Sequence, residues 1–226
     1  MTCPCSKPTK LWIASILAII IIGALTAYAY TSEQNALKGA TDLGMKSTVS
    51  VMATQLQASD IAGLKPGDEM NPQYLAVANH LQAMRSMDDN ILNAYILKVY
   101  PNRTAVFIVD DLYPDDPLGS TKIGEVSTAP DTMEMFGALS GPTVSKQPYT
   151  TKYGSFMSAY APIDNSVNDS AGNTEAVLAI DVSAKNYNAF TSQGGLPILV
   201  TGLVSMILAV GAIFFFGTRK EEKNGE

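Results

Sequence analysis

The sequence is poor in the residues that build metal centres and catalytic triads. Its 226 residues include one histidine, His80, and two cysteines, Cys3 and Cys5. There is no His-Glu-x-x-His motif, no pair of cysteines at zinc spacing and no glycine-rich phosphate loop. The serine within Gly137–Gly141 lies one position too late for a nucleophile elbow. These absences exclude the common hydrolase, metal and nucleotide sites. We expect no enzymatic activity and no cofactor, and we place His80 on the surface of a helix.

Cysteine is also missing from the whole middle of the chain. Both cysteines lie in a Cys-Pro-Cys tail, so no disulfide staples residues 31–194, whose stability must come from a hydrophobic core. The two thiols would bind a metal if several chains met, be acylated beside a membrane, or stay as reduced thiols in a disordered tail.

Two long runs, Leu11–Tyr30 and Leu196–Gly217, contain no charged residue. A bilayer core needs about 20 apolar residues in a helix, so the runs predict transmembrane helices over 11–30 and 195–217. A cleaved signal peptide is the alternative for the first run. Its apolar stretch is usually only about 7 to 15 residues, and Ala27–Ala29 is a weak cleavage site.

Basic residues lie just before the first run, at Lys7 and Lys10, and just after the second run, at Arg219 and Lys220. Such flanks stay in the cytoplasm. This predicts a two-pass membrane protein with cytoplasmic tails at 1–10 and 218–226 and an extracytoplasmic domain at 31–194. The nine-residue second tail leads us to expect no output domain behind the second helix. The outer segment carries ten Lys and Arg against eighteen Asp and Glu, which argues against nucleic acid as a partner.

Within the outer segment, helices are expected first. The stretch 31–64 lacks proline, and its apolar stripe predicts one long helix that ends at Lys65–Gly67. A second helix is expected from Asn71 or Pro72 to about Met87. The stripe consists of Met45, Val49, Met52 and Leu56.

The rest of the segment reads as an antiparallel sheet. Ala94–Tyr100 and Thr104–Asp110 predict one hairpin, and Phe156–Ile163 and Glu175–Ser183 predict another across the polar turn 164–173. A short helix is expected at 128–139. Helices followed by antiparallel strands give an α+β domain.

Several short motifs follow one another along the outer segment: Leu64–Glu69, the first hairpin, Gly141–Thr143, Pro148–Thr150, Tyr153–Ser158, Tyr160–Ile163 and Ala176–Val182. In their order and composition these motifs resemble the extracytoplasmic Cache sensor domain, a PAS-like fold also called PDC. The resemblance covers most of residues 31–190. It implies a long N-terminal helix packed on a central antiparallel PAS-like sheet, with a small-molecule pocket on the other face. Such domains usually pass a signal through the second membrane helix to an output domain.

Asp181 is the leading candidate for ligand contact. It lies inside an apolar strand and shares a face with Val177 and Ala179, because side chains alternate along a strand. A carboxylate buried there without a partner would be costly. It meets either the amino group of a ligand, as in amino-acid-binding relatives, or an internal group such as Lys152 or the Tyr153 hydroxyl.

Hydrogen-bonding side chains gather just before and within the strand that contains Phe156. They are suited to line a pocket around a small polar ligand, and Lys146 or Lys152 would neutralise a carboxylate. The alternative is that the tyrosines are plain core and turn residues. The candidates are Tyr149, Lys152, Tyr153, Ser158 and Tyr160.

Two further patterns leave alternatives open. Asp110, Asp111, Asp115 and Asp116 would either bind Ca²⁺ or form a solvated acidic turn. Sequons at Asn102 and Asn168 would be glycosylated only in a suitable organism.

We therefore expect a membrane-anchored sensor that binds a small organic ligand, namely an amino acid, an amine or a carboxylate. It would lie among membrane lipid and report to a second copy or to another membrane protein, and small residues spaced by four in both spans favour close helix contact. The alternative is a structural or assembly subunit that uses the Cache-like domain as an interaction module.

Overall fold

The computed structural model describes residues 7–163 and 176–222, which form two units. One unit contains the chain up to Gly39 and from Thr191 onward, and the other is the domain Ala40–Phe190. The Cys3–Cys5 tail, the turn 164–173 and Asn168 lie outside the described residues. The helices are α1 (Lys7–Ala53), α2 (Ala58–Ile61), α3 (Pro72–Arg85), α4 (Thr132–Gly137), the short 3₁₀ helix η1 (Ala138–Ser140), α5 (Ala184–Ser192) and α6 (Gly195–Glu222).

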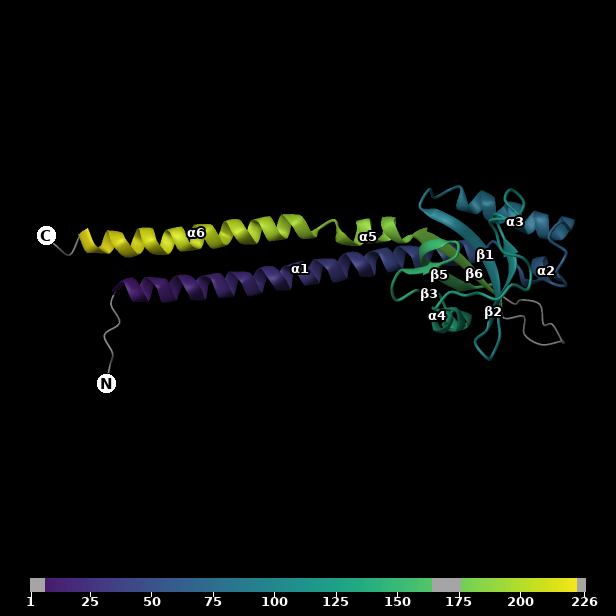
Figure 1. Ribbon diagram of the computed structural model, residues 1–226, viewed down its shortest axis with the longest axis horizontal. Helices are drawn as coiled ribbons and strands as arrows, with labels where there is room; N and C mark the ends of the chain where they lie inside the picture. The colour runs from purple at the N-terminus through teal and green to yellow at the C-terminus, as the bar shows by residue number, and fades with distance from the viewer. Residues whose placement is uncertain (1–6, 164–175, 223–226) are drawn as a thin grey trace. The chain divides into compact units, whose positions relative to one another are not determined.

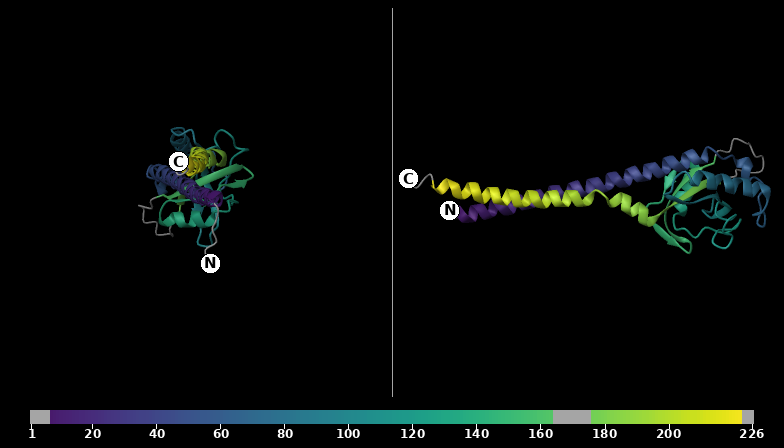
Figure 2. Two further views of the ribbon diagram at one scale, coloured as in Figure 1. Left: turned by 90° about the vertical axis from the view of Figure 1, so that its left-hand side faces the viewer. Right: turned by 90° about the horizontal axis from the view of Figure 1, so that it is seen from above.

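The first unit is an antiparallel pair made by the beginning of α1 and by α6 (Figures 1 and 2). The ring centroids of Trp12 and Phe214 are 5.4 Å apart. Gly202 lies so close to Thr26 that a Cβ at the glycine would come within 2.3 Å of the threonine hydroxyl oxygen. Large apolar side chains cover the outside of the pair, and by length and composition both helices are able to cross a membrane.

The domain is built on one antiparallel sheet, with strand order β2-β1-β6-β5-β3 and β4 paired to β5. The two hairpins expected from the sequence are confirmed, since β1 pairs with β2 and β5 pairs with β6. Two short strands were not expected, β3 and β4. The strands are β1 (Ile91–Val99), β2 (Ala105–Asp110), β3 (Thr143–Val144), β4 (Tyr149–Thr151), β5 (Gly154–Pro162) and β6 (Ala176–Ser183).

One face of the sheet packs against α1 and α3 and forms the larger core. Ile96, Leu178 and Ile180 point to this side, at most 1% exposed. The predicted helix stripe lies in the same cluster, with Val49 fully buried and Met45, Met52 and Leu56 nearly so. The prediction that the long helix packs on the sheet is thereby confirmed.

The long helix ends earlier than predicted. The expected end was near Lys65, whereas α1 stops at Ala53. The Thr54 hydroxyl donates a 2.7 Å hydrogen bond to the Val51 carbonyl, and the next amides turn back to carbonyls three residues earlier. This tightening lets the chain return toward the sheet, so that Ile61 on α2 joins the core.

The start of α3 agrees with the sequence prediction. The Asn71 side chain accepts a hydrogen bond from the Gln73 amide, and Pro72 occupies the first turn, where its missing N–H costs nothing.

The predicted short helix is observed as α4 followed by η1. Both pack on the second face of the sheet, where Met135 and Ala138 contact its core.

Candidate functional site

The second face of the sheet carries polar residues side by side across three strands. The register places Asn93 of β1 and Ser158 of β5 on either side of Asp181 in β6. The next row toward α4 contains Tyr95, Ala179 and Tyr160. Strand alternation alone would allow this row, but only the pairing of β1, β6 and β5 brings its members together.

A cavity of about 320 Å³ opens over this row, large enough for a small organic molecule. Its wall is formed by β1, β2, β4, β5 and β6 and by the loop after β2. It lies opposite the face that packs on α1 and α3. Its lining includes Tyr95, Phe107, Asp110, Thr121, Glu125, Tyr149, Tyr153, Phe156 and Asp181.

Asp181 forms the floor of the cavity and is 4% exposed. It accepts hydrogen bonds from the Ser158 hydroxyl and, at 3.1 Å, from the Tyr95 hydroxyl. Burial raises the pKa of Asp181 to about 7, although these bonds oppose the shift. Lys152 and Tyr153, its suggested internal partners, contact Glu125 instead. The carboxyl is therefore satisfied by neutral donors, and in the described chain no Lys, Arg or His forms an ion pair with it.

A second buried carboxyl, Asp131, lies one layer deeper. It accepts hydrogen bonds from the Ser145 hydroxyl and, at 2.6 Å, from the Tyr160 hydroxyl. The Tyr149 hydroxyl connects the two carboxyls, since it lies 2.6 Å from the Ser158 hydroxyl and 3.5 Å from that of Tyr160. Burial raises the pKa of Asp131 as well. The result is a continuous hydrogen-bonded layer beneath the cavity.

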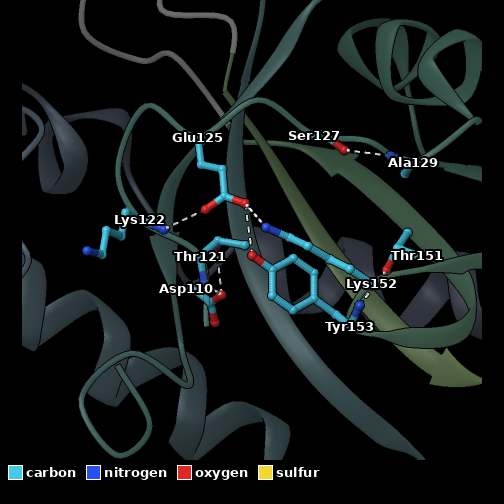
Figure 3. Close-up of polar contacts among 9 residues, drawn as sticks. All are labelled: Asp110, Thr121, Lys122, Glu125, Ser127, Ala129, Thr151, Lys152 and Tyr153. Carbon is cyan, nitrogen blue, oxygen red and sulfur yellow. Dashed lines mark hydrogen bonds and ion pairs between the residues drawn. The ribbon is translucent and has the colours of Figure 1, made fainter. Parts of the chain in front are cut away.

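A charged cluster lies on the cavity wall nearest the solvent. Glu125, in the loop after β2, accepts 2.9 Å bonds from the Lys152 ammonium and the Tyr153 hydroxyl (Figure 3). Burial by itself would raise the pKa of Glu125, but these two bonds, the Lys122 amide and the charge of Lys152 together lower it. Lys152 belongs to the turn between β4 and β5, so the cluster ties that turn to the loop.

The candidates taken from the sequence thus fall into three positions. Asp181, Tyr149 and Tyr153 line the cavity, and Ser158 and Tyr160 lie in the layer beneath it. Lys152 is exposed and contacts Glu125 rather than the floor.

The sequence reasoning missed Glu125 and the roles of Tyr95 and Asp110. Asp110 was assigned to an acidic loop, yet it is buried and accepts bonds from the amide and hydroxyl of Thr121 at 2.8 and 2.7 Å. Its neighbour Asp111 turns the other way and pairs with Arg85, and burial raises its pKa to about 6 despite that charge. The described residues contain no group of three or more metal-binding side chains. Alternation in β1 would have placed Tyr95 on the face opposite Ile96, but Glu125 lies in a loop without any periodic signal.

A second hollow of about 560 Å³ lies between α1 and α3. Most of its wall is apolar, including Val51, Met84 and Met87. His80 is exposed at its edge, as expected from the sequence. No buried carboxyl converges on this hollow in the described chain, which distinguishes it from the cavity over Asp181.

The sequence matches no protein-family model and no curated protein. Several solved structures resemble the chain, and three of them are described here. The sensory domain of the Campylobacter jejuni chemoreceptor Tlp3 with isoleucine bound is 14% identical, with a TM-score of 0.34, over 84% of this chain and 68% of that one. The extracellular domain of the proposed histidine kinase mmHK1S-Z2 is 8% identical, with a TM-score of 0.41, over 74% and 62%. The periplasmic domain of RsbU from Chlamydia trachomatis is 12% identical, with a TM-score of 0.36, over 73% and 56%.

Proposed function

We propose that this protein is a two-pass membrane protein whose central domain binds a small organic ligand outside the cytoplasm. The observation that carries the proposal is the cavity over Asp181. A buried carboxyl with a pKa near 7 forms its floor, and neutral hydroxyls are its donors. Clusters of polar groups at the bottom of a preformed cavity are typical of ligand sites, and perturbed titration supports the same interpretation. The ligand belongs to the amino acids, amines or small carboxylates.

The two membrane helices give ligand binding a route to a partner. The basic flanks at Lys7, Lys10, Arg219 and Lys220 support cytoplasmic tails at 1–10 and 218–226 and an outer domain at 31–194. Close approach of α1 and α6 at Gly202 supports one helix pair moving as a unit. In this proposal the pair passes the liganded state to a second copy or to another membrane protein, and the chain itself performs no chemistry.

The experiment is a thermal titration of the full-length protein in detergent micelles with amino acids, amines and small carboxylates. A ligand at a hundred times its dissociation constant stabilises the folded state by about 2.7 kcal/mol, which raises the melting temperature by several degrees. Asp181→Asn keeps the shape of the side chain and should abolish that rise, while the melting temperature without ligand stays within a few degrees.

The matched control is Asp115→Asn, whose side chain contacts Gln82 outside the cavity. It should leave the ligand-induced rise intact. If no compound raises the melting temperature of the unaltered protein, the assembly-subunit function replaces the sensor. A large loss of stability in Asp181→Asn without ligand would instead assign Asp181 a purely structural part.

A further inference from the structure

The carboxylates that line the cavity differ in the partners that they have within the protein. Three carboxylates line it, and the described lining contains no Lys, Arg or His. Glu125 already has the Lys152 ammonium. Asp110 accepts three hydrogen bonds, two from Thr121 and one from the Leu112 amide. Asp110 and Asp181 both have only neutral donors, but it is Asp181 that forms the floor of the cavity, so we expect a bound cation to pair with Asp181.

Aromatic rings surround the same space. The ring centroids of Tyr95 and Phe107 are 5.1 Å apart with their planes tilted by 45°, and both residues line the cavity. Tyr149 and Phe156 lie opposite each other on β4 and β5 and complete the wall. The faces of aromatic rings are electronegative. A cation within about 6 Å of such faces is attracted, and the attraction is largest where water is excluded.

Gly154 is what allows one of these rings to take its place. The residue has a φ of +144°, and a Cβ there would come within 2.8 Å of the Phe156 ring. The chain also places an ammonium over a ring beside this cavity, since the Lys152 nitrogen is 4.7 Å from the centroid of Tyr153. An intramolecular cation–π contact therefore lies at the edge of the cavity, beside the Glu125 pair.

We infer that the ligand is a small alkylated ammonium cation, a methylated amine or a quaternary ammonium compound, held between Asp181 and the rings of Tyr95, Phe107, Tyr149 and Phe156. The inference rests on the proposed function and narrows its ligand class. A carboxylate or a zwitterion would bring a negative charge into a lining without a free cation. A primary ammonium has three N–H groups to satisfy, whereas ring faces suit a cation whose surface is covered by methyl groups.

The test uses four probes on the full-length protein in micelles: choline, its uncharged isostere 3,3-dimethylbutan-1-ol, glycine and acetate. Choline should raise the melting temperature and bind at least about tenfold more tightly than the alcohol, measured by isothermal titration calorimetry. Equal binding of choline and the alcohol would overturn the inference, because only apolar packing would then be at work.

The remaining outcomes separate this inference from the proposed function. If glycine or acetate binds and choline does not, the cavity is a ligand site of another class and only the inference falls. If none of the four binds, and no compound of the wider titration binds, both fall together. If another compound of that titration binds while choline does not, the inference is again overturned alone.

Ring variants test the geometry directly. Phe107→Leu keeps apolar volume and removes a ring face, so choline affinity should fall about fivefold while the affinity for the alcohol changes little. Phe156→Leu is the second variant if Phe107→Leu lowers the melting temperature without ligand. The matched control is Phe136→Leu on α4, an exposed ring outside the cavity lining, which should not change choline affinity. Unaltered affinity in both cavity variants would overturn the inference.

Discussion

The two faces of the central sheet use the same strands for opposite purposes. In β6, Ala176, Leu178, Ile180 and Val182 face α1 and α3 and are sealed in the larger core. Val177, Ala179 and Asp181 point to the other side, where the row ends in a carboxyl on the floor of a cavity. An eight-residue strand therefore supplies a hydrophobic core and a polar site at once, because its side chains alternate.

The sealed face owes its stability to burial. Each fully buried Val, Leu, Ile or Met stabilises the fold by about 1.5–3 kcal/mol, and this face collects such residues from α1, α3 and four strands. The opposite face, which carries the cavity, gains less stability from burial because it contains polar side chains. Its carboxyls at Asp131 and Asp181 tolerate burial because hydroxyl groups donate to them and because a raised pKa favours their neutral form.

The largest expected effect is a charge placed in the sealed face. Val49→Asp puts a carboxyl where the side chain is fully buried against the sheet, and unfolding should become easier by about 4 kcal/mol or more. The melting temperature of the full-length protein in micelles measures it. Lys46→Asp, on the same helix at a partly exposed position, is the control and should be tolerated. Similar losses in both variants would mean that α1 does not pack on the sheet as described.

A backbone change at the edge of the site should have an intermediate effect. Gly154→Ala adds a Cβ against the Phe156 ring at a φ that L-residues rarely adopt, so we expect a loss of about 1–3 kcal/mol. The control is Gly44→Ala in α1, where a Cβ meets nothing within 4 Å and helix propensity predicts a gain of up to about 1 kcal/mol. A neutral result at Gly154 would show that the ring is free to move aside.

The smallest expected effect is a pH dependence of opposite sign to that of an ordinary aspartate. Asp181 titrates near pH 4 in the unfolded chain and at about 7 in the folded one. Between these values the folded protein holds a proton that the unfolded chain has lost, so this group's contribution to stability falls as pH rises and is level above pH 7. The groups facing it are Asn93, Tyr95, Tyr149, Ser158 and Asp131.

Asp181→Asn removes this titration. The melting temperature of the variant minus that of the unaltered protein should therefore rise by about a few degrees between pH 5 and pH 8. Asp115→Asn, outside the cavity, should not reproduce the rise. A difference that falls with pH would show that Asp181 has a cationic partner in the folded protein.

Much of the fold was predictable because local patterns determine it. The Met45–Leu56 stripe, the Asn71–Pro72 start of α3 and the two hairpins all appear where their periodicity and turn residues place them. The early end of α1 was missed because no proline or glycine marks it, and hydroxyl-to-carbonyl bonds like that of Thr54 also occur inside the helix, at Thr31 and Ser50. Strands β3 and β4 were missed because they contain two and three residues, too few for alternation to be visible.

The candidate site was likewise predictable in part, where local pattern determines it, and unpredictable where it depends on contacts distant in sequence. The sequence by itself determined which face Asp181 takes, since alternation needs only neighbouring residues. Only the tertiary structure decided what it meets. The register brings Ser158 and Tyr95 to Asp181 and leaves Lys152 with Glu125, from a loop 27 residues away. Partners that far apart in sequence are chosen by strand pairing and loop packing, and these depend on the free energy of the whole domain rather than on any local pattern.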